Sequence, residues 1–158
     1  SPNNKELATL RKLLEGLRNL KDNGTLPKFS APGINGRTAS SSELTGQVNV
    51  IFTLASWNYD SQNLMRKLNR LQKEHGDKLK VISICLDANV KECNKLLERD
   101  SIQWSCVCDG RMWETPLLNQ LGLYYVPDNI ITDSRGKIIA HTLPTNEIDQ
   151  KIQEILRK

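Results

Sequence analysis

Hydrophobic positions along the chain follow two rhythms, one typical of buried strands and the other of amphipathic helices. Three times, a short apolar run is followed by a stretch whose apolar residues recur at three- or four-residue steps. The predicted strand–helix pairs are 48–54 with 61–75, 79–86 with 89–99, and 103–108 with 113–121. Because each strand is followed by a helix, we expect a largely parallel sheet with right-handed crossover connections.

The segments before and after this series depart from the alternation. Near the C-terminus, apolar residues on both sides of Asp133–Gly136 predict an antiparallel hairpin followed by a last helix. Residues 25–47 are loop-rich, with a tight turn predicted at Asn35-Gly36 and a short helical turn from Ser41 or Ser42. The hairpin strands are predicted at 129–132 and 137–141, and the last helix at 145–157.

A further amphipathic helix is predicted at the start of the chain, over residues 4–22. Its leucines form one stripe, and Asn23-Gly24 supplies a stop signal. We therefore divide the chain into an N-terminal helical segment, 1–24, which is a candidate remnant of an upstream domain, and a main domain, 25–158. The leucine stripe needs a covering surface, and self-association through this helix is one way to provide it.

Composition and charge exclude several classes of protein. A chain of 158 residues with 38% hydrophobic and 25% charged residues suits one globular domain with a sizeable core. No apolar run approaches the ~20 residues that a membrane span requires, so we expect no transmembrane segment. The net charge of +4 is mild, and no Lys/Arg cluster is interleaved with aromatic residues, so we expect no binding to nucleic acid.

The turn between the first predicted strand and its helix, 55–61, carries the most informative chemistry. It reads Ala-Ser-Trp-Asn-Tyr-Asp-Ser, with Trp57 near the end of the strand and Ser61 at the start of the helix. No Gly-x-Ser-x-Gly elbow surrounds Ser61, which argues against a serine hydrolase. A helix cap is the better interpretation of this serine.

Four stretches resemble one family, the thioredoxin-like thiol–disulfide oxidoreductases of the bacterial envelope (the TlpA/ResA group), with their AhpC/TSA relatives. They occur in the family's order, at 26–37, 42–46, 48–57 and 126–138. The resemblance implies a thioredoxin-like α/β fold, with a central mixed sheet flanked by helices. The strand–helix insert at 103–121 fits these relatives, and the helix at 4–22 is an addition.

The same resemblance shows what the turn lacks. Where the family carries Trp-Cys-x-x-Cys, this chain has Trp57 followed by Asn58 and Ser61 at the two sulfur positions. Disulfide exchange requires an attacking thiolate, which neither an amide nor a hydroxyl supplies. Pro127 matches the family's cis-proline, whose loop faces the redox pair and presents backbone groups to an extended substrate. We therefore expect a cis Val126–Pro127 bond.

The four cysteines lie outside that turn. Cys85 sits in an apolar run, where a buried thiol is expected. Cys106 and Cys108 point to the same face of a predicted strand, but Cα atoms two strand steps apart, ~6.6 Å, are near the long limit for a disulfide. No cysteine occupies the position that a peroxidase would need at the end of the strand 48–54.

No cofactor or metal is expected from the sequence. His75 and His141 are the only histidines, and they are far apart in the chain. The spacing of the cysteines does not match that of a zinc site.

We interpret the chain as a redox-inactive thioredoxin-like domain that serves as a binding or scaffolding module of the bacterial periplasm or envelope. Lipid anchoring through an upstream segment is a further option. The groove would take a protein or peptide partner, and Trp57, Tyr59 and Asp60 would form its exposed wall. Its predicted residues are Trp57, Asn58, Tyr59, Asp60, Ser61, Val126 and Pro127.

Two other functions stay open from the sequence. One is a residual thiol–disulfide oxidoreductase that uses Cys106, Cys108 or the thiols of a partner. The other is a purely structural role, in which the N-terminal helix drives assembly.

Overall fold

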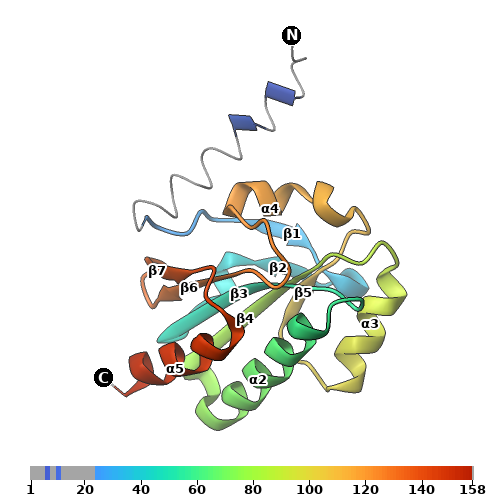
Figure 1. Ribbon diagram of the computed structural model, residues 1–158. Coiled ribbons are helices and arrows are strands. Elements are labelled where there is room, and N and C mark those ends of the chain that lie inside the picture. Colours follow the sequence, from blue (N-terminus) through green and yellow to red (C-terminus); the bar gives the residue numbers. More distant parts are fainter. Residues whose placement is uncertain (1–5, 8–9, 12–23, 158) are drawn as a thin grey trace.

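A five-stranded mixed sheet forms the centre of the molecule, in the order β5-β4-β3-β6-β7 (Figure 1). The computed structural model describes residues 6–7, 10–11 and 24–157. The strands are β3 (Val48–Leu54), β4 (Leu79–Cys85), β5 (Ser105–Val107), β6 (Asn129–Asp133) and β7 (Ile138–His141). β3, β4 and β5 run parallel, whereas β6 is antiparallel to β3 and β7 to β6. The predicted parallel core and terminal hairpin are confirmed.

Helices cover both faces of this sheet (Figure 1). One face packs against the three longer helices, and the other against the short helix α4 together with the segment 26–39. The helices are α2 (Tyr59–His75), α3 (Val90–Arg99), α4 (Pro116–Leu121) and α5 (Thr145–Leu156). This arrangement is the thioredoxin-like α/β fold that the resemblance implies.

The central strand β3 is buried on both faces of the sheet, so both faces must be packed against other elements. Every residue of β3 is buried, and its apolar side chains alternate between two cores. Val50 and Phe52 belong to the core under α2, α3 and α5, while Ile51 belongs to the core under α4. A strand buried on both faces reads as a continuous apolar run, which is why 48–54 could be located from the sequence.

Small elements precede and connect the strands. β1 (Ser30–Pro32) pairs with β2 (Thr38–Ser40) through a turn in which Asn35 and Gly36 have positive φ, as the Asn-Gly pair predicts. The short helical turn begins at Ser41, as predicted, and Ser40 caps it in a capping box with Glu43. The single-turn 3-10 helices are η1 (Ile34–Gly36), η2 (Ser41–Glu43), η3 (Gly76–Lys78) and η4 (Met112–Glu114).

Three predicted boundaries are corrected by the structure. The helix predicted at 113–121 is divided into η4 and α4, because Pro116 lacks the N–H that a continuous helix would use. The strand predicted at 103–108 is shorter, since only 105–107 pair with β4. Helix α2 begins at Tyr59, two residues before the predicted start, because Asn58 caps it.

The predicted N-terminal helix falls mostly outside the described residues. Of the range 4–22, the structure describes residues 6, 7, 10 and 11, which are helical. Among the helices of the described segments, none has the length and hydrophobicity that a membrane crossing requires.

Candidate functional site

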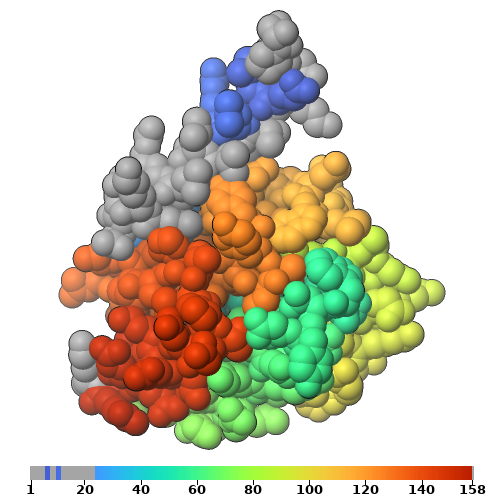
Figure 2. All heavy atoms as spheres, viewed as in Figure 1, coloured from blue at the N-terminus to red at the C-terminus, as the bar shows by residue number. Residues whose placement is uncertain are grey.

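The candidate site lies at the end of the sheet formed by the carboxyl ends of the three parallel strands. The turn 55–61 follows β3, Asp87 follows β4 and Cys108 follows β5, so these segments meet at one edge. The loop 124–128 enters at the same edge, because β6 pairs its first residue, Asn129, with Phe52 near the end of β3. In Figure 2 the teal atoms at the start of α2 adjoin the orange atoms of the segment before β6.

Asn58 and Ser61 form a closed hydrogen-bond network at the start of α2. Asn58 Oδ1 accepts a hydrogen bond from the backbone N–H of Ser61 at 2.7 Å, so Asn58, and not Ser61, caps the helix. The fully buried Ser61 hydroxyl donates to the backbone oxygen of Asn58 at 2.8 Å and accepts from the N–H of Ala55 at 3.1 Å. An amide and a hydroxyl therefore satisfy the polar groups of this turn.

The Val126–Pro127 loop faces this network. The Val126–Pro127 bond is cis, as predicted. Asn58 Nδ2 donates to the carbonyl oxygen of Val126 at 3.2 Å, which joins the turn to the loop. The structure thus brings together the two halves of the predicted groove.

Two buried residues hold this loop from the sheet side. Thr53 Oγ1 donates to the carbonyl of Tyr125 and accepts from the N–H of Asp128, both at 2.7 Å. The Asp128 carboxylate accepts from the N–H groups of Tyr124 at 2.9 Å, Tyr125 at 3.4 Å and Asn129 at 2.8 Å. Burial, and secondly the charge of Asp128, raises the pKa of Tyr124. Thr53 and Asp128 were not predicted as site residues, although a polar residue inside an apolar strand, as Thr53 is, is a usable signal.

Exposed aromatic residues are the neighbours in the chain of both Asn58 and Val126, which form the contact between turn and loop. Trp57 is 55% exposed and Tyr59 is 73% exposed, and Asp60 is exposed beside them, as predicted. Tyr125, which the sequence analysis did not include, is 62% exposed on the opposite loop. Aromatic side chains at a surface offer large, rigid contact areas to a partner.

Asp87 links the turn to the core below it. Its carboxylate accepts from the backbone N–H of Ser56 at 3.0 and 3.2 Å and from the Ser56 hydroxyl at 3.0 Å. The Cys85 thiol donates to the same carboxylate at 3.5 Å. The side chain of Asp87 is therefore shared between the candidate site and a group of cysteines.

All four cysteines of the chain are buried on the α2–α3–α5 face of the sheet and form one cluster. The Sγ atoms of Cys85, Cys93 and Cys108 lie within 4.8 Å of one another. The Sγ atom of Cys106 lies 3.8 Å from that of Cys93. The prediction that Cys106 and Cys108 share a face is confirmed, since Val107 between them packs in the opposite core.

This cluster was not predicted from the sequence, because cysteine spacing describes only ligands that are close in the chain. β4, α3 and the segment 106–108, which includes the end of β5, supply the sulfur atoms, and only the fold brings these three parts of the chain together. The contact with Cys108 and burial raise the pKa of Cys85, and the contact with Cys106 raises that of Cys93. The contacts with Cys85 and Cys93 lower the pKa of Cys108.

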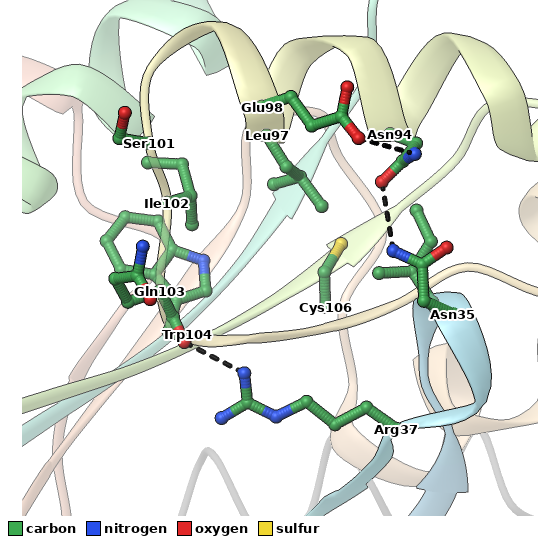
Figure 3. A pocket seen from close by; sticks show the side chains of 11 residues that line it. Asn35, Arg37, Asn94, Leu97, Glu98, Ser101, Ile102, Gln103, Trp104 and Cys106 are labelled. Atoms are coloured by element: carbon green, nitrogen blue, oxygen red, sulfur yellow. Dashed lines mark hydrogen bonds between the residues drawn. The ribbon is translucent and has the colours of Figure 1, made fainter.

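A surface pocket reaches the cluster from the side. Its volume is about 400 Å³, and it lies between η1, α3 and the segment 101–106. Asn35 Nδ2 donates to Asn94 Oδ1 at 3.2 Å, and Asn94 donates to Glu98 at 3.2 Å, across the pocket's upper side (Figure 3). The sulfur of Cys106 points into this pocket (Figure 3).

Comparisons with known proteins give a consistent family relationship. The model of the AhpC/TSA family matches residues 23–141. The sequence gives no match among curated proteins.

Solved structures of thiol–disulfide oxidoreductases share the fold. A domain assigned as the C-terminal domain of a thiol-disulfide oxidoreductase from Bacteroides thetaiotaomicron is 30% identical, with a TM-score of 0.69, over 84% of this chain and 94% of that one. A thiol-disulfide oxidoreductase from Bacteroides fragilis is 25% identical, with a TM-score of 0.70, over 83% and 98%. A secreted disulfide oxidoreductase from Mycobacterium tuberculosis is 13% identical, with a TM-score of 0.63, over 80% and 95%, which supports the fold alone.

Proposed function

The chain belongs to the AhpC/TSA family, and we propose that it is a redox-inactive, thioredoxin-like module that binds a protein or peptide segment. The observation that carries this proposal is the network at the start of α2. Asn58 and Ser61 stand where the resemblance places the two reactive sulfurs, and their polar groups already bond to each other and to Val126. A side chain that is engaged in this way has a structural role at the turn without any exchange chemistry.

The burial of the cysteines supports the redox-inactive half of the proposal. Thiol–disulfide exchange needs a thiolate that can reach the sulfur of a partner. All four thiols are buried. The carboxylate of Asp87 lies between Cys85 and the turn residue Ser56, with hydrogen bonds to both.

The surface around the turn supports the binding half. Trp57 and Tyr59 are exposed on one side of the Asn58–Val126 contact, and Tyr125 is exposed on the other. An extended segment that crossed this contact would lie against aromatic rings from both sides. Such rings provide much of the binding energy in known protein interfaces.

The alternative function is a residual thiol–disulfide oxidoreductase. It would use Cys106 or Cys108, or the thiols of a partner. The pocket that reaches the Cys106 sulfur is the observation in its favour. The burial of both thiols argues against it.

For the location of the protein we propose the bacterial periplasm or envelope. The support is the family resemblance to envelope thiol–disulfide oxidoreductases, and one structural relative is described as secreted. Lipid anchoring through an upstream segment stays a separate hypothesis.

Truncating the exposed aromatics tests the binding site. Linear peptides that bind the protein are first selected from a displayed random library. We expect these peptides to bind the Trp57→Ala and Tyr125→Ala variants at least ~10-fold more weakly than the unaltered protein, a loss of about 1.4 kcal/mol. Titration calorimetry or fluorescence anisotropy gives the affinities. Arg135→Ala is the control, because Arg135 lies in the β6–β7 turn at the opposite end of the sheet, and it should leave binding unchanged. Peptides that bind Trp57→Ala and Tyr125→Ala as tightly as the unaltered protein would place binding elsewhere.

A further inference from the structure

The cluster of four cysteines has a geometry that the proposed binding function does not use. We propose that Cys85, Cys93, Cys106 and Cys108 form a thiolate site for a thiophilic d10 cation such as Zn²⁺. Three of the sulfur atoms lie within 4.8 Å of one another, and the fourth lies 3.8 Å from Cys93. Sulfur atoms that bind one tetrahedral zinc at Zn–S distances of ~2.3 Å are about 3.8 Å apart. The cluster is therefore close to a ligand set before any ion enters.

The kind of donor selects the kind of ion. Every ligand atom of the cluster is a sulfur, and soft thiolates favour zinc and other thiophilic metals over Mg²⁺ or Ca²⁺. The nearby oxygen donor is the carboxylate of Asp87, 3.5 Å from the Cys85 sulfur, and Ser56 already engages it. Each thiol that coordinates the ion releases its proton to water.

Space filling alone explains the cluster less well. A single buried cysteine is an ordinary small apolar residue. Here the four cysteines of the chain gather in one core from β4, α3 and the segment 106–108, and three of their sulfurs lie within 4.8 Å of one another. Apolar packing needs no sulfur at any of these positions, whereas a thiolate metal site needs several sulfurs close together.

An entry path leads to the cluster. The pocket of about 400 Å³ opens between η1 and α3, and the Cys106 sulfur points into it (Figure 3). Cys93 lies next to Cys106, so an ion that enters the pocket meets Cys106 first and the other three sulfurs behind it. The charged residues that line this pocket are Glu98, which attracts a cation, and Arg37, which repels one, so the pocket supplies access to the sulfurs rather than attraction.

Metal binding by the whole chain tests the proposal. The protein is purified without oxygen, fully reduced, and loaded with Zn²⁺ or Co²⁺ alone. We expect about one Zn²⁺ per chain by elemental analysis. We also expect Co²⁺ to give the sulfur-to-cobalt charge-transfer band and the visible bands of a tetrahedral thiolate site. Loaded protein should unfold at a higher temperature than metal-free protein, because the ion binds the folded state.

Variants assign the site to the cluster. Cys93→Ser removes the sulfur that contacts Cys106. Loss of a residue that only supports a metal ligand weakens binding by up to ~100-fold, so we expect loss of a ligand itself to weaken Zn²⁺ binding by at least that factor. Val107→Ala is the matched control, because Val107 lies between two of the cysteines but packs in the opposite core. It should lower stability while the stoichiometry and the cobalt spectrum stay unchanged.

Several results would overturn the proposal. Reduced protein that binds no Zn²⁺ and gives no charge-transfer band would do so without any variant, so a misfolded variant cannot hide the answer. A Cys93→Ser variant that binds Zn²⁺ as tightly as the unaltered protein would place the ion elsewhere. A Cys93–Cys106 disulfide in the protein as isolated, together with a reduced form that binds no Zn²⁺, would point to redox chemistry instead.

Discussion

The double variant Asn58→Cys plus Ser61→Cys is expected to gain a disulfide and measurable reductase activity. Position 58 is the N-cap of the 17-residue helix α2, where Asn58 now accepts a hydrogen bond from the N–H of Ser61. Free N–H groups and the helix dipole at this end favour an anion, so the pKa of the new thiol should fall below the ordinary ~8.5. Position 61 lies three residues on, where side chains of the same helix face are ~5–6 Å apart, within reach of a bridge.

We expect the double variant to be less stable than the unaltered protein in its reduced form. Ser61 is fully buried, and its hydroxyl accepts a hydrogen bond from Ala55 N–H and shares its one proton between the backbone oxygens of Asn58 and Ala55, contacts that a thiol reproduces poorly. We expect a loss of about 1–3 kcal/mol in the free energy of unfolding of the reduced variant. Oxidation should recover part of this loss, because a bridge restricts the unfolded chain.

Mass spectrometry after alkylation counts the bridges in this experiment. The matched control is Asn63→Cys plus Arg66→Cys, which has the same spacing on the exposed face of α2 but lies away from the helix start. Its thiols should keep an ordinary pKa and should not support insulin reduction. A folded Asn58→Cys plus Ser61→Cys variant that never closes a bridge would show that the turn is not a vacated redox site.

Asp128→Ala is expected to cause the largest loss of stability among changes near the site. The Asp128 carboxylate is buried and accepts from three backbone N–H groups, of residues 124, 125 and 129. Alanine would leave these groups without an acceptor, at about 3 kcal/mol in total. In a domain of this size that loss lowers the melting temperature by about 10 °C. Peptide affinity should fall as well, because the same contacts hold the Tyr125–Pro127 segment in place.

Asp133→Ala is the matched control for this change. The Asp133 carboxylate also accepts from two backbone N–H groups, of Arg135 and Lys137, but these contacts are exposed in the β6–β7 turn. Water replaces an exposed acceptor, so we expect a loss of no more than ~1 kcal/mol. Calorimetric melting of both variants makes the comparison. Equal losses in the two variants would show that burial at Asp128 does not decide the stability of the loop.

Much of the fold could be predicted from local sequence patterns. The strand at 48–54 was located to the residue because it is buried on both faces and reads as an unbroken apolar run. The β6–β7 hairpin was placed by its turn residues, and the cis bond before Pro127 by the family resemblance. The prediction of one helix over 113–121 was wrong, because Pro116 interrupts it.

The candidate site was harder to predict than the fold, because it is formed by segments that are far apart in the chain. Residues 56–61 were identified, but the roles of Asn58 and Ser61 were not, since only the structure shows which of them caps α2. Tyr125 escaped notice because nothing in its local sequence marks it as exposed opposite Trp57. The cysteine cluster forms only when three separate parts of the chain pack together, and the spacing of cysteines within one segment cannot predict this.

Insulin reduction in the presence of dithiothreitol tests the central claim most directly. The claim is that this chain keeps the frame of a thiol–disulfide oxidoreductase without its exchange chemistry. The unaltered protein should reduce insulin no faster than dithiothreitol alone, while the variant Asn58→Cys plus Ser61→Cys should be faster. A rate for the unaltered protein near that of an ordinary thioredoxin would contradict the claim and would favour catalysis by the buried cysteines.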